Sequence, residues 1–187
     1  CIAIQSNQND QHGGQSIVNF DYGLADGVAK TYRKLYLKNI EKYCEIVECP
    51  IDYEQLKEAS YEITERTGKM PALKADETYL AEELAMLEKL IGDKAIAEKA
   101  QKFALKKTES ETDKATYQAM EALIHNLNTM HSRAGAQTPF SSVNYGMDTS
   151  AEGRMVMKNM LLATEAGLGH GETPIFPIQI FRVKDGI

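Results

Sequence analysis

The chain has 187 residues, of which 43% are hydrophobic and 26% are charged, and its formal net charge is -6. This length and apolar content predict a folded domain, or a large part of one, and argue against a disordered segment. The acidic balance argues against a broad nucleic-acid surface, although a local basic pocket for a free nucleotide is compatible with it. No apolar run approaches the roughly 20 residues that cross a bilayer, so we expect no membrane segment and a cytoplasmic protein.

The three cysteines are Cys1, Cys44 and Cys49, with no nearby array of Cys and His at metal-ligand spacing. Structural zinc usually takes four such ligands, so we expect no metal site within this chain. An odd set of thiols fits a reducing compartment. Because the chain opens inside a helical pattern without a methionine and stops just after an apolar run, we expect a piece of a longer protein. A trimmed or processed small protein is the alternative.

The first two thirds of the sequence predicts almost continuous helix. A first helix within residues 1–11 ends at His12-Gly13-Gly14, and a connector over residues 15–26 follows. Beyond the connector, apolar residues recur every three or four positions, which is helical spacing. The predicted helices cover residues 27–49, 53–67, 77–91, 94–106 and 112–131, separated by Pro50, Gly68, Gly92 and the polar run 107–111.

The pattern changes near His131. Residues 137–145 (QTPFSSVNY) are rich in β-branched and aromatic side chains and predict a strand. Thr149 and Glu152 match a capping box, so a helix should begin there and end in the glycine-rich residues 167–171. The apolar run 174–183 (PIFPIQIFRV) predicts a second strand.

Strand, helix and strand in this order imply a right-handed parallel crossover, and therefore an α/β fold. Ligands of such folds gather at the carboxyl ends of the strands, here near Asn144 and Val183. Two parallel strands do not make a stable sheet by themselves, so we expect further strands from elsewhere.

Three blocks within residues 131–187 closely resemble the catalytic core of anaerobic (class III) ribonucleoside-triphosphate reductases. The blocks read AGAQTPFSSVNYG, EGRMVMKNMLLATEAGLG and ETPIFPIQIFRVKDG. The opening IQSNQNDQHGGQSI is similar to the helix and glycine turn that precede the long dimer helix of that family. These matches are long, and together they cover about a third of the chain.

The resemblance implies a ten-stranded α/β barrel of the glycyl-radical type, of which this chain is a mostly helical internal fragment of the catalytic domain. Residues 1–132 would form a helical effector and dimer region, and residues 133–187 a strand-helix-strand part of the barrel. The implied activity is radical reduction of ribonucleoside triphosphates to deoxyribonucleoside triphosphates. The whole enzyme would carry a glycyl radical and a zinc site, bind ATP or deoxynucleoside triphosphates as effectors, form a homodimer and be activated by a radical-SAM enzyme.

The chain departs from this family in lacking its radical machinery. No residue matches the finger-loop cysteine, the second active-site cysteine, the radical glycine or the four-cysteine zinc cluster. We therefore assign no catalytic residue and expect the fragment alone to be inactive. Two alternatives remain: another glycyl-radical enzyme, which should lack the blocks quoted above, and a non-catalytic helical module for nucleotide binding or dimerisation.

The predicted strand 137–145 supplies the candidate substrate-binding residues Thr138, Ser141, Ser142 and Asn144. Its polar side chains alternate with apolar ones, so one face is suited to hydrogen-bonding a phosphate or ribose while the other packs under helices. The alternative is that the serine hydroxyls satisfy backbone groups in a crowded barrel.

The helix predicted over residues 27–49 supplies a candidate effector site. Lys30, Lys34 and Lys38 recur at four-residue steps and form one basic stripe. The resemblance implies that effectors bind at a dimer interface built by this region, and their phosphates need cations. We assign these lysines, with the amides of Gln5 and Gln8, to effector binding; a solvated lysine face is the alternative.

Overall fold

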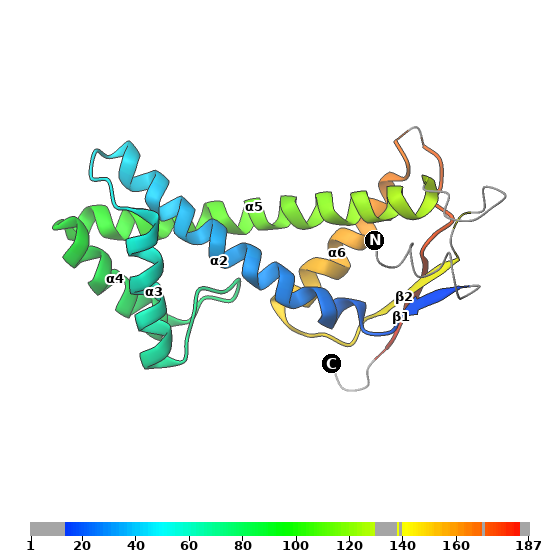
Figure 1. Ribbon diagram of the computed structural model, residues 1–187, viewed down its shortest axis with the longest axis horizontal. Coiled ribbons are helices and arrows are strands. Elements are labelled where there is room, and N and C mark those ends of the chain that lie inside the picture. The colour runs from blue at the N-terminus through cyan, green and yellow to red at the C-terminus, as the bar shows by residue number, and fades with distance from the viewer. Residues whose placement is uncertain (1–13, 130–137, 139, 170, 184–187) are drawn as a thin grey trace. The chain divides into compact units, whose positions relative to one another are not determined.

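The computed structural model describes residues 14–129, 138, 140–169 and 171–183. Its elements in chain order are β1 (Gln15–Ile17), α2 (Phe20–Ile46), α3 (Tyr53–Thr67), α4 (Glu77–Ile91), α5 (Lys94–Thr129), β2 (Ser141–Tyr145), α6 (Ala151–Ala166) and β3 (Ile178–Phe181) (Figure 1). The helix predicted within residues 1–11 lies outside the described residues. Across the described ranges, no helix combines the length and apolar character needed to cross a membrane.

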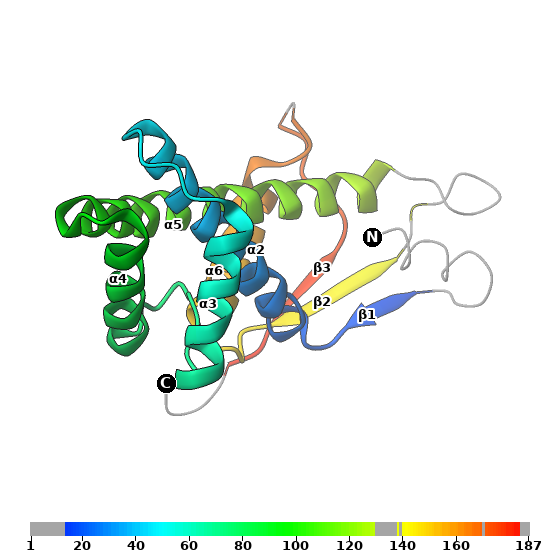
Figure 2. The ribbon, with the colours of Figure 1, turned by 60° about the vertical axis from the view of Figure 1, so that its left-hand side comes forward.

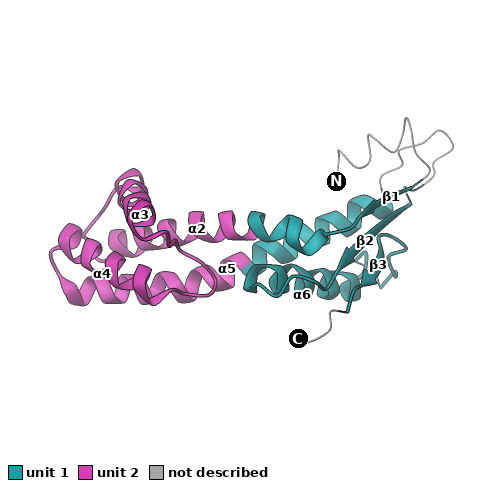
Figure 3. Cartoon of the chain, turned by 90° about the horizontal axis from the view of Figure 1, so that it is seen from below, with its two compact units in different colours: residues 1–27, 113–187 teal, residues 28–112 magenta. Residues whose placement is uncertain are grey.

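The chain divides into two compact units (Figure 3). Unit 1 comprises residues 1–27 and 113–187 and contains the sheet, whereas unit 2 comprises residues 28–112 and contains α3 and α4. Both α2 and α5 contribute residues to each unit. The functional division into residues 1–132 and 133–187 stays a prediction.

The sheet of unit 1 has three parallel strands in the order β1-β2-β3 (Figure 2). The predicted parallel pairing of the two C-terminal strands is therefore confirmed, and the fold class is α/β with mostly helical content. The connector predicted over residues 15–26 is wrong, because residues 15–17 form β1 and α2 begins at Phe20. A three-residue strand is too short to show a periodic pattern, and its partner β2 lies far away in the sequence.

The strand predicted over residues 174–183 is shorter in the structure, where β3 covers Ile178–Phe181. The backbone N–H groups of Ile175 and Phe176 donate to Oδ1 of Asn128 at 2.9 and 3.0 Å. The Asn128 amide also donates to the Phe176 carbonyl at 2.6 Å. These backbone groups bond to a side chain of α5 and so are not available to extend the strand ladder.

Helix α6 begins one residue later than the predicted capping box requires. Ser150 is the N-cap, and its hydroxyl accepts a hydrogen bond from the Gly153 N–H at 3.0 Å. Thr149 is exposed, so the predicted pairing of Thr149 with Glu152 is wrong. Asp148 explains the shift, because its carboxylate accepts the Ser150 N–H at 2.8 Å and sets the turn before the helix.

The polar run 107–111 does not separate two helices, and α5 is continuous from Lys94 to Thr129. The run contains neither glycine nor proline, so nothing in it breaks helical geometry. Within unit 2 its polar side chains have a partner: the Asn39 amide on α2 donates to Thr108 Oγ1 at 3.0 Å and to Glu111 Oε2 at 2.9 Å.

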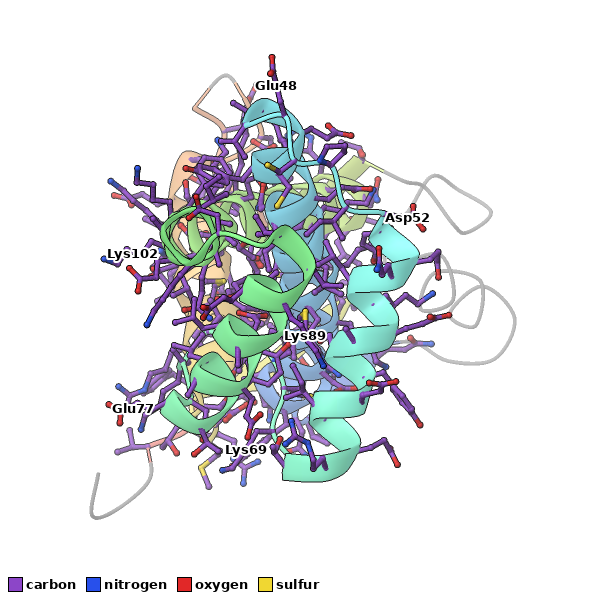
Figure 4. All side chains as sticks on the ribbon, turned by 90° about the vertical axis from the view of Figure 1, so that its left-hand side faces the viewer. Glu48, Asp52, Lys69, Glu77, Lys89 and Lys102 are labelled. Carbon is purple, nitrogen blue, oxygen red and sulfur yellow. The ribbon has the colours of Figure 1, made fainter. Side chains whose placement is uncertain are left out.

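The core of unit 2 is an apolar cluster to which α2, α3, α4 and α5 all contribute. Its buried members are Tyr32, Tyr36, Leu37, Ile40, Cys44, Ile51, Leu56, Leu87, Ala97, Ala100 and Ala104. Helices α3 and α4 lie side by side and antiparallel, with Asp52 at the start of α3 and Glu77 at the start of α4 at opposite ends of the pair (Figure 4). Each ends at a glycine in the left-handed conformation, Gly68 and Gly92, as the sequence predicted.

Candidate functional site

The three-stranded sheet has one covered face and one open face. Along β2, Ser141, Val143 and Tyr145 are buried, whereas Ser142 and Asn144 are half-buried. Alternate residues of a strand point to opposite faces, so these two sets belong to different faces. The sequence predicted this alternation.

Helix α6 packs on the covered face. Gln179 of β3, which pairs with Val143, donates from its amide to Thr164 Oγ1 on α6 at 2.6 Å. The same Gln179 accepts a hydrogen bond of 2.6 Å from the Tyr145 hydroxyl. Burial raises the pKa of Tyr145, which keeps this hydroxyl a donor. The covered face is thus fixed by packing and by a continuous set of hydrogen bonds.

The strand register defines the open face. Ser16 pairs with Ser142, which pairs in turn with Ile178, and Asn144 pairs with Ile180. Ile178 is 55% exposed and Ile180 is 44% exposed. Polar groups from β1 and β2 therefore lie beside an apolar strip on β3, a combination suited to a ligand with both polar and ring-like parts.

Asn144 carries the clearest sign of a missing partner on this face. Its Oδ1 atom is buried and has no hydrogen-bond partner among the described residues. A buried amide oxygen without a partner costs free energy, so native structures usually supply one. On the covered face, Ser141 Oγ is also buried and also has no hydrogen-bond partner in the part of the chain that the structure describes.

The predicted substrate residues separate in the structure. Ser142 and Asn144 come together on the open face, whereas Ser141 faces the covered side. Thr138 is half-buried and lies before β2. A substrate role for all four stays a prediction, and the geometry favours Ser142 and Asn144.

A hollow of about 270 Å³ lies at the amino ends of the strands. Its lining comes from the first residues of all three strands and from the residues before them: Gly14, Gln15, Ser16, Phe140, Ser141, Ser142 and Ile178. Sites for drug-sized ligands usually occupy about 300–1,000 Å³, so this hollow matches part of a nucleotide. The sequence placed ligands at the carboxyl ends of the strands, and the hollow lies at the opposite ends.

The carboxyl end of β2 is held by Asp21, from the first turn of α2. The backbone N–H groups of Gly146, Met147 and Asp148 each donate to its Oδ2 atom at 2.9 Å. Burial raises the pKa of Asp21, but these donors and the Tyr22 N–H outweigh it and hold the pKa below its ordinary value. Asp21 is therefore an ionised, buried anchor.

Sequence reasoning missed Ser16 and Asp21. The sequence pattern predicts a connector over residues 15–26 and so places neither residue on a defined element. The available signal for Ser16 was the polar segment after Gly13-Gly14, but the register that puts it beside Ser142 is set by pairing between distant segments. Asp21 bonds to residues 125 to 127 positions away, which no local pattern reveals.

The three predicted effector lysines lie on α2, and all are exposed. Lys30, Lys34 and Lys38 fall within unit 2, on one face of the helix because of their four-residue spacing. Gln5 and Gln8 lie outside the described residues. The effector assignment stays a prediction.

The cysteines of the described region do not fit a zinc site. Cys44 is buried in the core of unit 2, and Cys49 is half-buried just after α2. No group of three or more His, Cys, Asp or Glu side chains able to hold a metal ion occurs in the described ranges.

Comparison with known proteins gives one family. The model of the anaerobic ribonucleoside-triphosphate reductase family matches residues 1–187. The anaerobic ribonucleoside-triphosphate reductase of Salmonella typhimurium is 38% identical over 79 residues, and that of Escherichia coli is equally similar. The enzyme of the same name from phage T4 is 39% identical over 85 residues. These alignments cover 42%, 42% and 45% of this chain but 11%, 11% and 14% of the relatives, so the matched stretch spans a small part of their length.

Proposed function

Because the chain belongs to the anaerobic ribonucleoside-triphosphate reductase family, we propose that it is part of an enzyme that reduces ribonucleoside triphosphates to deoxyribonucleoside triphosphates. Reduction at the ribose by radical chemistry removes the 2'-hydroxyl. The glycyl radical and the reactive cysteine would come from other parts of that enzyme. The contribution of this chain is to bind and orient nucleotides.

We propose the open face of the sheet as the part that touches substrate, and the orphaned Asn144 Oδ1 is the observation that carries this proposal. A ribose hydroxyl donates hydrogen bonds, so it would supply the partner that the amide oxygen lacks once the amide turns this oxygen toward the open face. Ser142, on the same face, offers a hydroxyl to ribose or phosphate oxygens. Ile178 and Ile180 would pack against the base or the sugar ring.

In this proposal β2 takes no part in the radical chemistry and contributes by holding the ribose in place. Hydrogen abstraction needs the ribose within about 3–3.5 Å of the abstracting atom, so small errors of placement cost much of the rate. Ser142 and Asn144 lie on a strand that is packed from behind by α6, and a rigid element holds a substrate more accurately than a loop does.

The test is a set of single substitutions in the intact enzyme that contains this chain. Asn144→Ala and Ser142→Ala should each lower kcat/KM for ribonucleoside triphosphates about two- to tenfold, since a hydrogen bond between neutral groups contributes about 0.5–1.5 kcal/mol. Ser110→Ala, at an exposed serine of α5, is the matched control and should behave as wild type. An unchanged kcat/KM in both site variants would refute the proposed substrate face.

We further propose that Lys30, Lys34 and Lys38, with Gln5 and Gln8, bind a deoxynucleoside triphosphate or ATP effector at a homodimer interface. The support is the exposure and alignment of the three lysines on α2, which would present three ammonium groups to a triphosphate. The same dimer would be the substrate of a radical-SAM activating enzyme in the cytoplasm.

The effector proposal is tested by binding. Lys34→Ala and Lys38→Ala should each weaken effector affinity about tenfold, measured by isothermal titration with a deoxynucleoside triphosphate. Lys106→Ala, at an exposed lysine of α5, keeps the net charge of the variants and should leave affinity unchanged. Equal affinity in all three proteins would show that the stripe is an ordinary solvated face.

A further inference from the structure

The turn that follows β2 is fixed by a side chain from a distant part of the chain. Three successive backbone N–H groups, from Gly146 to Asp148, converge on Oδ2 of Asp21 at 2.9 Å each. The other oxygen, Oδ1, accepts the Tyr22 N–H at 3.0 Å. Four backbone donors thus surround one carboxylate.

The Asp21 carboxylate depends on these four donors. Its side chain is 1% exposed, so water does not compete for its oxygens. A buried carboxylate is stable only where donors replace its hydration, and charge-assisted hydrogen bonds are about twice as strong as neutral ones. The turn and the carboxylate therefore hold one another in place.

The turn after β2 also lies in close contact with the residue that follows β3. Gly146 has a φ of +112°, and a Cβ atom there would collide with the Arg182 carbonyl oxygen. The Arg182 N–H donates to the Tyr145 carbonyl at 2.7 Å, directly before the turn. Asn144 is the residue before Tyr145, so the direction of its side chain depends on how this strand end is held.

A chain of hydrogen bonds connects Asp21 to the start of α6. Asp148, whose N–H bonds to Asp21, accepts the Ser150 N–H, and Ser150 caps α6. Helix α6 in turn bonds to Gln179 behind the sheet. Loss of the Asp21 carboxylate would therefore affect the position of β2 in two ways, through the turn at its carboxyl end and through α6 on its covered face.

Consecutive backbone N–H groups of this kind form a nest that binds anions. Here the carboxylate of Asp21 already fills the nest. A substrate phosphate is consequently excluded from this turn.

We propose that Asp21 is a positioning residue of the substrate site, whose carboxylate fixes the turn 146–148 so that Asn144 and Ser142 keep their places on the open face. This inference rests on the proposed function, since it needs the open face to bind substrate. Asp21 itself touches no substrate; it acts through the strand.

The experiment compares Asp21→Asn and Asp21→Ala with wild type in the intact enzyme. The control is Glu45→Gln, which neutralises an exposed carboxylate of the same helix α2. Two quantities are measured: hydrogen exchange of the amides of residues 146–148, and KM and kcat for a ribonucleoside triphosphate per active radical. Asparagine keeps the size of the side chain, so Asp21→Asn remains informative if the alanine variant folds poorly.

We expect faster exchange at residues 146–148 and about a tenfold fall in kcat/KM in Asp21→Asn, with the control unchanged. A merely structural role would lower the melting temperature or the yield of folded enzyme and leave KM and kcat per radical as in wild type; that result would overturn the inference. The Asn144→Ala variant separates the two claims. If Asn144→Ala lowers kcat/KM and Asp21→Asn does not, positioning by Asp21 is wrong while the substrate face stands. If Asn144→Ala, Ser142→Ala and Asp21→Asn all keep the wild-type kcat/KM, both are wrong.

Discussion

The hydroxyl of Tyr36 donates a hydrogen bond of 2.6 Å to Oε2 of Glu83, a carboxyl group with no exposed surface in the core of unit 2. Gln101 donates to the same oxygen at 2.9 Å, while Oε1 has no partner among the described residues. Burial raises the pKa of Glu83, and hydrogen bonds from Tyr36, Gln101 and Tyr79 offset this only in part. A neutral carboxylic acid is the form that suits this site.

The stability of unit 2 should therefore depend on pH. The folded pKa of Glu83 lies above its unfolded value near 4.5, so the folded state binds more protons. The stabilisation is complete below that unfolded value and is lost as the pH rises through the folded pKa. Glu83→Gln mimics the protonated acid and should flatten the decline above pH 4.5, measured by urea unfolding at several pH values. Glu88→Gln, at an exposed position of α4, should keep the wild-type slope, and an equal slope in Glu83→Gln would contradict the assignment.

Asn128 should be essential for the segment before β3. Asn128→Ala removes the acceptor for two backbone N–H groups and the donor to the Phe176 carbonyl. Leaving a buried backbone group without a partner costs about 1–3 kcal/mol, so chemical unfolding should show a loss in that range. Gln118→Ala, at an exposed amide of the same helix, tests whether any amide of α5 has this effect. A loss below about 0.5 kcal/mol in Asn128→Ala would show that these three hydrogen bonds do not hold the segment before β3.

The cap of α6 can be assigned by a pair of neighbouring substitutions. Ser150→Ala removes the hydroxyl that accepts the Gly153 N–H and should cost about 1 kcal/mol of unfolding free energy. Thr149→Ala removes an exposed hydroxyl and should change stability by less than about 0.5 kcal/mol. The reverse order of effects would restore Thr149 as the cap.

Gly146 should not tolerate a side chain. Its φ of +112° is costly for other residues, and a Cβ atom would meet the Arg182 carbonyl. Gly146→Ala should destabilise unit 1 by about 1–3 kcal/mol, measured by thermal unfolding. Gly169→Ala also places alanine at a positive φ, +107°, but in open space, so it separates backbone strain from collision. Equal losses in the two variants would show that the close approach to Arg182 contributes nothing.

The thiols of Cys44 and Cys49 should react at different rates. Burial, followed by the neighbouring Cys49, raises the pKa of Cys44 to about 11, and the side chain has no exposed surface. The thiolate is the reactive form, so alkylation by iodoacetamide at neutral pH should be much slower at Cys44 than at half-buried Cys49. Peptide mapping after a timed reaction distinguishes the two. Faster labelling of Cys44 would place it outside the core.

Patterns within one segment predicted most of the helices. The ends of α3 and α4 at Gly68 and Gly92 follow from glycine chemistry that acts over four residues. The strand around Ser142 and its alternation of faces were also predicted, because period-two patterning is a local signal.

Features that depend on distant partners were missed. β1 is a strand because it pairs with β2, more than a hundred residues away in the sequence. Asp21 is held by the backbone N–H groups of the turn 146–148, which is equally distant. The polar run 107–111 predicts a break from sequence alone, because its partner Asn39 lies on another helix. Ser142 and Asn144 of the candidate substrate face were therefore predictable from the pattern of one strand. The neighbours of these residues on β1 and β3 follow only from the pairing of the strands.

The edge position of β3 has a practical consequence for handling the protein. β3 is at an edge of the sheet, and its exposed apolar side chains include Ile178 and Phe181, at 55% and 61% exposure. An edge strand with free backbone groups and apolar side chains recruits further strands, including those of another copy. Preparations of this chain by itself should therefore aggregate as the concentration rises, and a charged fusion partner next to β3 should keep them in solution.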